Sequence, residues 1–274
     1  MAKHTMLPDN SQSVLEYISL KTSKTRHATL IDPANQTPIE ASRMAEAAVE
    51  AGTNLIMIGG STETPHNVVE ETVNTIQEIF ELRCWSATQN IEANEEIWKI
   101  PIVLFPGGSR ALASKADAIT FMTLMNSDSR KYLMDEQRLG AQYILKNNIE
   151  PIPTGYLIYS PGGKAGQVGE ALLIQKEDLE STVQYASAAN CFNFQILYLE
   201  AGSGAKTPIT TEHISLAREH FKNTLFVGGG IRTTNQIKQA SQSGADWVVT
   251  GTVIESYSNL DELKIKLQEL ISAL

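Results

Sequence analysis

Short runs of hydrophobic residues alternate along the chain with longer stretches in which apolar positions recur at helical spacing. The first run is HATLID, at residues 27–32. Residues 38–51 follow it, are rich in Ala and Glu, and end at Gly52, a residue that commonly ends helices. This segment therefore predicts one strand followed by one helix, and the same pair recurs along the rest of the sequence.

Eight strands are predicted in all. The other seven are residues 55–59, 102–106, 118–123, 155–160, 194–200, 225–228 and 247–251. Helices are predicted at residues 64–83, 131–147, 176–189, 211–221, 234–243 and 259–274, whereas residues 109–115, after the third strand, have room for only one turn. Apolar strands that alternate with amphipathic helices indicate a parallel sheet, and eight such units favour a (β/α)8 TIM barrel. An open doubly wound sheet is the alternative.

The length of 274 residues fits one large α/β domain, because closed barrels of this kind commonly need about 250 residues. We therefore expect a single TIM-barrel domain over residues 1–274. Within it, residues 1–26 form an N-terminal helical extension. The polar residues 84–99 lengthen the second helix-to-strand connection and are expected to be a surface insertion.

Composition and charge narrow the class of protein. Hydrophobic residues make up 42% of the chain and charged residues 19%, which is typical of a globular protein. The net charge of −9 argues against a nucleic-acid partner. No run approaches the roughly 20 apolar residues of a membrane helix, and the N-terminus has no apolar signal segment. With two cysteines, Cys84 and Cys191, in no metal-like spacing, we expect a cytoplasmic protein with free thiols and no stable membrane insertion.

Glycines, carboxylates and small hydroxyls gather just after the predicted strands. In a TIM barrel the active residues lie at this carboxyl end. The clearest cases are Gly228–Arg232 (GGGIR) after the seventh strand and Gly251-Thr252 after the eighth. Glycines let backbone N–H groups approach an anion closely, and the loops after strands seven and eight frequently bind phosphate. We interpret these two segments as a phosphate site, the alternative being two tight turns.

Three further side chains are candidates for chemistry at the barrel mouth. Asp32 could bind Mg²⁺, hold a hydroxyl or act as a base, or could form an Asx-turn before Pro33. Ser61 could join the Mg²⁺ through its oxygen or could cap a helix. Glu200 ends the otherwise apolar run FQILYLE, where a carboxylate is costly unless it is paired or has a function, and we favour a general base. Tyr198 alternates with Glu200 and should share its face.

Other polar and sulphur-containing residues are interpreted more simply. Lys164 could hold a diphosphate or could be solvated surface. His27 starts a strand, at the wrong end for catalysis, and is expected to be a hydrogen-bonded core residue. Met122 and Met125 are expected to fill the core rather than a lipid groove.

Taken together, these segments resemble the geranylgeranylglyceryl phosphate synthase family. The matching stretches run in order from residue 27 onward: LIDP, IMIGGST, VLFPGGS, ADAITFMTLMNS, PTGYLIYSPGGKAG, YLEAGSGA, FVGGGIR and ADWVVTGTVIE. Motifs such as GGGIR occur in many phosphate-binding barrels, whereas the ordered set, and YLEAGSGA above all, is specific.

The resemblance implies transfer of a geranylgeranyl group from geranylgeranyl diphosphate to the C3 hydroxyl of sn-glycerol 1-phosphate, with release of diphosphate. It places Mg²⁺ at Asp32 and Ser61, and it makes Glu200 the catalytic residue. The substrate-binding positions that it implies are Tyr198, Leu199, Glu200, Ala201, Gly202, Ser203, Gly204, Gly229, Gly230, Gly251 and Thr252. It also suggests a homo-oligomer, either a dimer or a hexamer.

One position departs from the pattern of some family members, which carry a lysine two residues before the aspartate. Here that residue is Leu30, as in the other main subgroup, so the cation that balances the phosphate is open between Arg232, Lys206 and Lys164. The length of the prenyl chain is also open. An FMN enzyme of the same fold is the alternative, because GGGIR and a following GT pair also suit the phosphate of FMN. A non-catalytic binder of a phosphate ligand is a third hypothesis.

Overall fold

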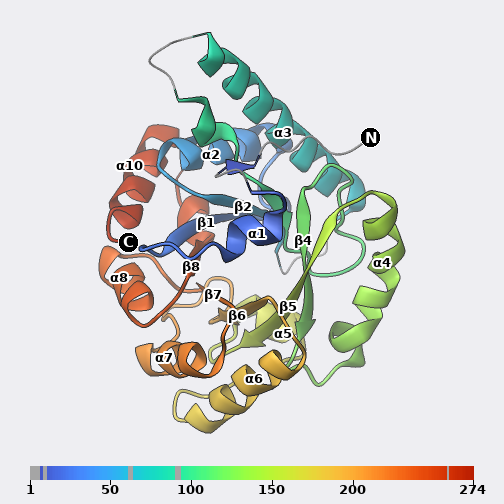
Figure 1. Ribbon diagram of the computed structural model, residues 1–274, viewed down its shortest axis with the longest axis vertical. Helices are drawn as coiled ribbons and strands as arrows, with labels where there is room; N and C mark the ends of the chain where they lie inside the picture. Colours follow the sequence, from blue (N-terminus) through green and yellow to red (C-terminus); the bar gives the residue numbers. More distant parts are fainter. Residues whose placement is uncertain (1–6, 9–10, 61–63, 90–93, 258) are drawn as a thin grey trace.

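Eight parallel strands form a closed barrel in the computed structural model, each paired with the next along the chain and β8 with β1 (Figure 1). The structure describes residues 7–8, 11–60, 64–89, 94–257 and 259–274. The strands are β1 (Arg26–Ile31), β2 (Leu55–Ile58), β3 (Ile102–Leu104), β4 (Ala118–Leu124), β5 (Glu150–Ile158), β6 (Ile196–Glu200), β7 (Thr224–Gly228) and β8 (Trp247–Thr250). The predicted TIM barrel is confirmed, and the open sheet is excluded.

Helices surround the barrel and run back from the carboxyl end of one strand to the start of the next, except between β3 and β4. The longer ones are α2 (Pro38–Glu50), α3 (His66–Thr88), α4 (Glu136–Lys146), α6 (Leu179–Cys191), α7 (Thr211–His220), α8 (Thr234–Gln242) and α10 (Leu260–Ile271). The shorter ones are α1 (Val14–Ser19), α5 (Gly163–Val168), α9 (Thr252–Glu255), the 3₁₀ turn η2 (Glu95–Trp98) and the π-helical η3 (Lys131–Asp135). Local sequence defines several starts: Thr37 and Glu40 form a capping box around Pro38 at the start of α2.

The core has two layers because successive side chains of a strand point to opposite faces. Tyr198 and Ile196 of β6 belong to the cluster inside the barrel. Leu197 and Leu199 of the same strand belong to the cluster between the barrel and its helices. The alternation predicted for Tyr198 and Glu200 therefore holds, and both side chains reach the interior.

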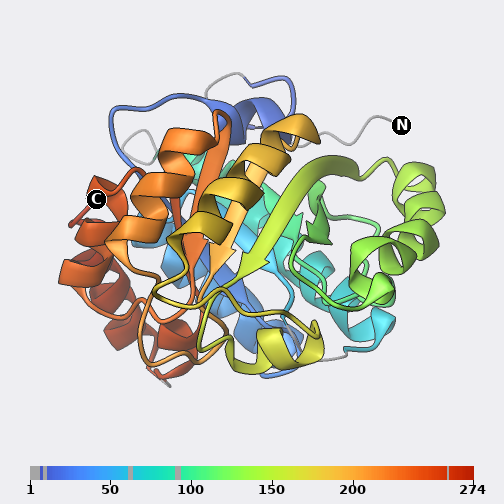
Figure 2. The ribbon, with the colours of Figure 1, turned by 90° about the horizontal axis from the view of Figure 1, so that it is seen from below.

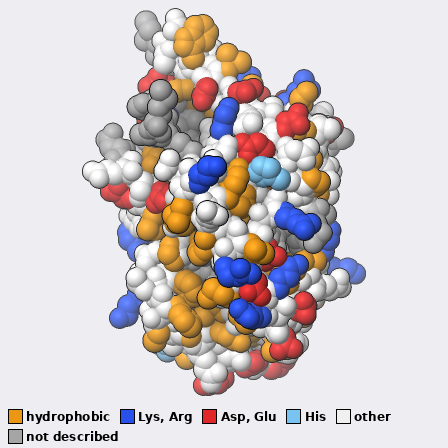
Figure 3. Space-filling view, turned by 90° about the vertical axis from the view of Figure 1, so that its right-hand side faces the viewer, with side chains coloured by type: hydrophobic (Ala, Val, Ile, Leu, Met, Phe, Trp, Pro, Cys, Tyr) orange, Lys and Arg blue, Asp and Glu red, His pale blue; other side chains and the backbone are white. Residues whose placement is uncertain are grey.

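The outer ring of helices is interrupted between β3 and β4. The chain there, all of it described, forms turns and no helix, as the short segment at residues 109–115 predicted. The next helical segment, η3 with α4, lies to one side of the barrel (Figure 1). Hydrophobic side chains gather on that side of the molecule (Figure 3), and the exposed ones in this segment include Met134, Leu139 and Leu145.

Strand β5 begins at Glu150, five residues before the predicted start at residue 155. The two prolines in its first half, Pro151 and Pro153, concealed it in the sequence. The N–H of Glu150 points to β4, where it donates to the carbonyl of Asp117, so positions 151 and 153 face the opposite side. There β6 pairs with β5 only from Thr154 onward. Neither proline therefore removes a hydrogen bond from the sheet.

Helix α1, within the N-terminal extension, covers the amino end of the barrel. The Arg26 guanidinium donates to the carbonyl oxygens of Tyr17, Ile18 and Leu20 and lies over the Trp247 ring, 4.0 Å from its centroid. The Trp247 indole N–H donates to Ile18 O at 3.0 Å. In Figure 2 this blue helix lies at the opposite end of the barrel from the yellow-green α5. The contacts close the amino end and leave the carboxyl end for ligands.

Residues 84–99 divide into parts with different surroundings. Cys84–Thr88 continue α3, and residues 90–93 lie outside the described part of the chain. Trp98 in η2 is buried and packs against Phe80, with 6.1 Å between the ring centroids.

No helix in the described ranges has the length and apolar character that crossing a bilayer requires.

His27 is buried in a network of hydroxyls on the outside of the strands. Its Nδ1 lies 2.6 Å from Thr53 Oγ1 and its Nε2 lies 2.9 Å from Thr250 Oγ1. Burial lowers the pKa of His27 from 6.5 to about 3. The prediction of a hydrogen-bonded core histidine is confirmed.

This network predicts a pH-dependent stability. Between pH 6.5 and 3 the unfolded chain binds a proton at His27 that the folded chain rejects, so the free energy of unfolding falls as the pH falls through this window. His27→Gln should remove its share of the slope, up to about 1.4 kcal/mol per pH unit, in denaturant titrations across that range. Thr53→Val keeps the imidazole, and should lose stability while retaining the slope. Equal slopes for wild type and His27→Gln would contradict the assignment.

Candidate functional site

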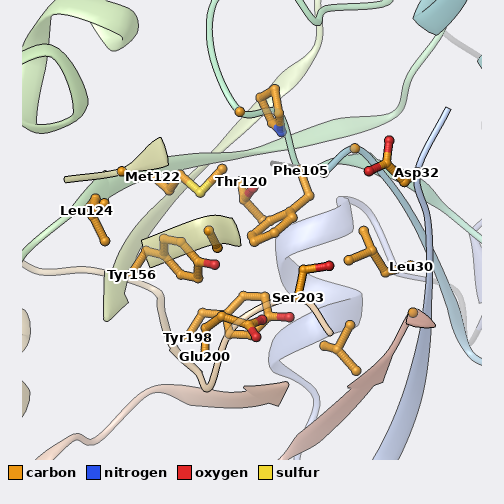
Figure 4. Close-up of a pocket in the computed structure, with 18 of the residues that line it drawn as sticks. Leu30, Asp32, Phe105, Thr120, Met122, Leu124, Tyr156, Tyr198, Glu200 and Ser203 are labelled. Carbon is orange, nitrogen blue, oxygen red and sulfur yellow. The ribbon is translucent and has the colours of Figure 1, made fainter. Parts of the chain in front are cut away.

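One large cavity opens at the carboxyl end of the barrel. Residues near or after the ends of all eight strands line it, from Leu30 near the end of β1 to Gly251 after β8. Figure 4 shows Asp32 and Leu30 on one side of the cavity and Met122 and Leu124 across from them, with Ser203 and Glu200 between. The cavity therefore joins a polar end to an apolar end.

The polar end contains the predicted phosphate glycines. Gly229 and Gly230 follow β7 with φ of 81° and 72°, a left-handed conformation that favours glycine. A side-chain carbon on Gly229 would lie 2.7 Å from the backbone nitrogen of Ala201, and one on Gly230 would lie 2.7 Å from Thr207 O. The loops after β6 and β7 are thus in backbone contact, and neither position has room for a side chain.

The loop after β8 is tied to the loop after β6. Thr252 begins α9, and its Oγ1 accepts a hydrogen bond from the backbone N–H of Gly204 at 3.3 Å. Gly251 and Thr252 both line the cavity beside Gly229 and Gly230. The structure therefore brings together the two segments that the sequence assigned to phosphate binding.

Glu200 is 5% exposed at the end of β6. Its Oε1 accepts a hydrogen bond from the backbone N–H of Gly202 at 2.6 Å. Burial raises the pKa of Glu200 to about 7, against the lowering effect of Gly202 N–H and the Tyr198 hydroxyl. A carboxyl group with a pKa near neutrality, at a cavity wall, can accept a proton from a bound ligand.

Tyr198 is 1% exposed, and its hydroxyl lies against Gly228, where a side chain would not fit. The Glu200 carboxyl group is the polar neighbour of this hydroxyl, and their hydrogen bond lowers the pKa of Glu200. Burial and the nearby Glu200 carboxylate raise the pKa of Tyr198 well above 10. The phenol therefore stays protonated beside the Glu200 carboxyl group.

Asp32 reaches the mouth directly after β1. Its Oδ1 accepts a hydrogen bond from Ala34 N–H at 3.0 Å, so the Asx-turn that was the structural alternative is present. The same side chain lines the cavity, above Gly60. Burial raises the pKa of Asp32, the Glu255 carboxylate adds to this, and the Lys164 ammonium opposes it. The turn thus fixes a carboxylate at the mouth.

A divalent cation would need oxygen donors at this place. Across the described part of the chain, no three His, Cys, Asp or Glu side chains come close enough together to form a metal site. Mg²⁺ needs fewer protein ligands than that, because it is commonly held by one or two carboxylates together with substrate phosphates. Asp32 fits this requirement. Ser61, the second predicted position, lies outside the described residues.

The other predicted positions in β6 and in the loop after it differ in whether their side chains reach the cavity. Ser203 lines the cavity. The side chains of Leu199 and Ala201 pack outside the barrel, so these two residues can face a ligand only through their backbone. Of the candidate cations, Arg232 lines the cavity and donates to Ala205 O, whereas Lys164 and Lys206 are exposed.

Sequence reasoning missed the apolar end of the cavity. Its lining includes Leu112 after β3, Thr120, Phe121, Met122 and Leu124 of β4, Tyr156 of β5, and Tyr132, Gln137, Gly140 and Ile144 of η3 and α4. Met122 packs against the cluster inside the barrel and also lines the cavity, so the expectation of core filling alone is incomplete. Met125 packs against Gly155 on the outside of the barrel, as core filling requires. The short segment after β3 was the one available signal, since a missing helix leaves room beside β4.

Comparison with known proteins places this geometry in a family. The model of the PcrB family matches residues 20–270. A geranylgeranylglyceryl phosphate synthase of Methanosarcina mazei is 42% identical over 249 residues, which cover 90% of this chain and 92% of that protein. The crystal structure of (S)-3-O-geranylgeranylglyceryl phosphate synthase from Thermoplasma acidophilum in complex with its substrate sn-glycerol-1-phosphate superposes with a TM-score of 0.84. It is 35% identical, and the match covers 96% of this chain and all of that one.

A second solved structure, the wild-type synthase from Thermoplasma volcanium, gives a TM-score of 0.83 at 34% identity, covering 95% of this chain and 96% of that one. These matches span nearly the whole chain, and they confirm the resemblance found in the sequence motifs. The chain belongs to the PcrB family, together with the geranylgeranylglyceryl phosphate synthases.

Proposed function

We propose that this protein transfers a geranylgeranyl group from geranylgeranyl diphosphate to the C3 hydroxyl of sn-glycerol 1-phosphate. The observation that carries the proposal is a single cavity with glycine loops for a phosphate at one end and an apolar extension beside β4 at the other. Glu200 lies between the two, where a hydroxyl would meet a prenyl carbon (Figure 4). The Thermoplasma acidophilum relative is described with sn-glycerol-1-phosphate as its substrate.

The glycerol phosphate is bound in the proposal by the loops after β6, β7 and β8. Backbone N–H groups of Gly229, Gly230 and Gly251 surround its phosphate, and Arg232, which lines the same end, balances its charge. The chain carries a net charge of −9, so local backbone donors rather than the overall field must hold this anion. With the phosphate fixed, the free hydroxyl is positioned without contact to the reacting carbon.

The reaction then needs a base and a leaving group. Glu200 accepts the proton of the C3 hydroxyl while the glycerol oxygen bonds to C1 of the donor. The bond between C1 and the diphosphate oxygen breaks, and both of its electrons leave with diphosphate. Asp32 would hold Mg²⁺, with Ser61 as the second expected ligand. The cation, when bound, neutralises charge on the leaving diphosphate.

We also propose that the protein acts in the cytoplasm as a homo-oligomer, for which the exposed apolar side chains of η3 and α4 offer a surface.

The central test is an assay with prenyl diphosphates of C15 to C35 and sn-glycerol 1-phosphate. We expect diphosphate release and ether formation only when both substrates are present, with C20 preferred. Glu200→Gln keeps the shape of the side chain and removes the base, so the rate should fall on the order of 100-fold or more. Transfer at the wild-type rate by the variant would exclude a general base, and no turnover with any donor would exclude the function.

The pH profile gives a separate check on Glu200. Because its pKa is raised to about 7 and the carboxylate is the active form, kcat/KM should rise as the pH increases through about 7 and then level off. The profile of Glu200→Gln should lack this rise. Ionisation of the substrate phosphate affects both proteins equally, so the difference between the two profiles reports on Glu200 alone.

Asp32→Asn tests the proposed cation site. The variant keeps the hydrogen bond from Ala34 N–H but loses the negative charge that a hard cation prefers. The Mg²⁺ concentration for half-maximal rate should rise roughly tenfold or more, as loss of even a supporting group does at metal sites. Chelation should abolish wild-type activity, and added Mg²⁺ should restore it. An unchanged Mg²⁺ requirement in Asp32→Asn would place the cation elsewhere.

A further inference from the structure

Three aromatic rings meet in the middle of the cavity. Phe105 follows β3, Tyr156 belongs to β5 and Tyr198 to β6, and all three line the cavity. The ring centroids lie 5.4 Å apart for Phe105 and Tyr156, 5.1 Å for Phe105 and Tyr198, and 5.3 Å for Tyr156 and Tyr198. They form one cluster from three strands, which we call the aromatic triad.

The aromatic triad lies at the junction of the two ends of the cavity. Figure 4 shows the three rings between Met122 and Leu124 on one side and Asp32 and Ser203 on the other. A donor whose diphosphate lies near Asp32 and whose chain runs toward Met122 would therefore place its first carbons against these rings. Nothing in the family comparison or in the sequence motifs assigned a role to Phe105 or Tyr156.

The charges around the junction suit a place where positive charge develops on a ligand. Among the described lining residues, Arg232 in the loop after β7 is the single Lys or Arg, and Figure 4 shows the Glu200 carboxyl group beside the Tyr198 ring. Burial, together with Glu200, raises the pKa of both Tyr156 and Tyr198 well above 10, so their phenols stay neutral. Neutral aromatic faces carry partial negative charge and attract cations, more strongly where water is excluded.

We propose that the aromatic triad stabilises the positive charge that develops on the allylic carbons of the prenyl donor as its C1–O bond breaks. The inference rests on the proposed prenyl transfer and adds Phe105, Tyr156 and Tyr198 to it as groups that face the reacting carbons. Both electrons of the broken bond leave with diphosphate, the glycerol oxygen forms the new bond to C1, and its proton passes to Glu200. The rings take no part in bond exchange and act through their faces alone.

A second aromatic pair in the same barrel supplies a matched control. Phe226 and Trp247 stack deeper in the interior, with centroids 5.4 Å apart, and neither is among the residues that line the cavity. Phe226 also contacts Tyr198, at 6.0 Å between centroids. Changes at Phe226 therefore test the effect of altered core packing, because this ring does not face the donor.

The test replaces Phe105 with mono-, di- and trifluorinated phenylalanine, which withdraw electron density from the ring and nearly preserve its shape. The single-turnover rate of ether formation from geranylgeranyl diphosphate and sn-glycerol 1-phosphate should fall with each added fluorine. We expect a total loss of about tenfold, the scale of a desolvated cation–π contact, while the Kd of the donor stays within about twofold. A rate that does not change along the series would overturn the proposal, as would a series whose effect lies entirely in donor binding.

The same fluorinated series at Phe226 should leave the rate unchanged, because that ring faces no substrate. Tyr156→Phe keeps the ring and should retain most of the rate, whereas Tyr156→Leu should lose roughly tenfold or more. If Tyr156→Leu does not fold, the isosteric series at Phe105 still decides. A wild-type protein that forms no ether with any donor would refute the proposed function, whereas an active wild type with a flat series would refute the aromatic triad alone.

Discussion

Backbone-to-backbone contact between the loops after β5, β6 and β7 is the constraint on which the polar end of the cavity depends. Gly163 approaches Ser203, Gly202 approaches Gly162, and Gly229 lies over the backbone of Ala201. At each of these glycines a side-chain carbon would clash with the facing backbone. The close approach places Gly202 N–H on the Glu200 carboxyl group and sets both beside the glycines after β7, so one packing arrangement positions the proposed base and the proposed phosphate site together.

The apolar end depends on a different feature, the missing helix between β3 and β4. In a regular barrel a helix would cover this part of the sheet, and its side chains would fill the space beside β4. Here η3 and α4 stand to one side, held by Gln137, whose amide donates to the carbonyl oxygens of Met122 and Tyr132. The space that remains opens into the barrel mouth, so that an extended apolar chain can reach the polar site.

The sequence predicted the barrel and the gathering of glycines and carboxylates at its carboxyl end, because each of these leaves a local signature. Strands alternate with helices at a readable spacing, and the glycines and carboxylates stand directly after the apolar runs. Apart from the short segment after β3, the apolar end left no such signature: Thr120, Tyr156 and Ile144 are ordinary barrel and helix residues, and only their arrangement in space separates a cavity wall from a core. The start of β5 was missed for a related reason, since Pro151 and Pro153 are compatible with a strand only where no neighbour needs their N–H groups.

The two ends of the cavity differ in what sequence change can do to them. At the polar end Gly202, Gly229 and Gly230 of the loops after β6 and β7 have no room for side chains, so substitutions at these positions destroy the site rather than adjust it. The apolar end is built from side chains, and exchanging one of them for a larger or smaller one alters the depth available to a ligand while leaving the loops after β6 and β7 untouched. A barrel of this design can therefore change the apolar tail of the ligand that it accepts while the polar head group of that ligand stays the same. This is possible because backbone atoms form one end of the cavity and side chains form the other.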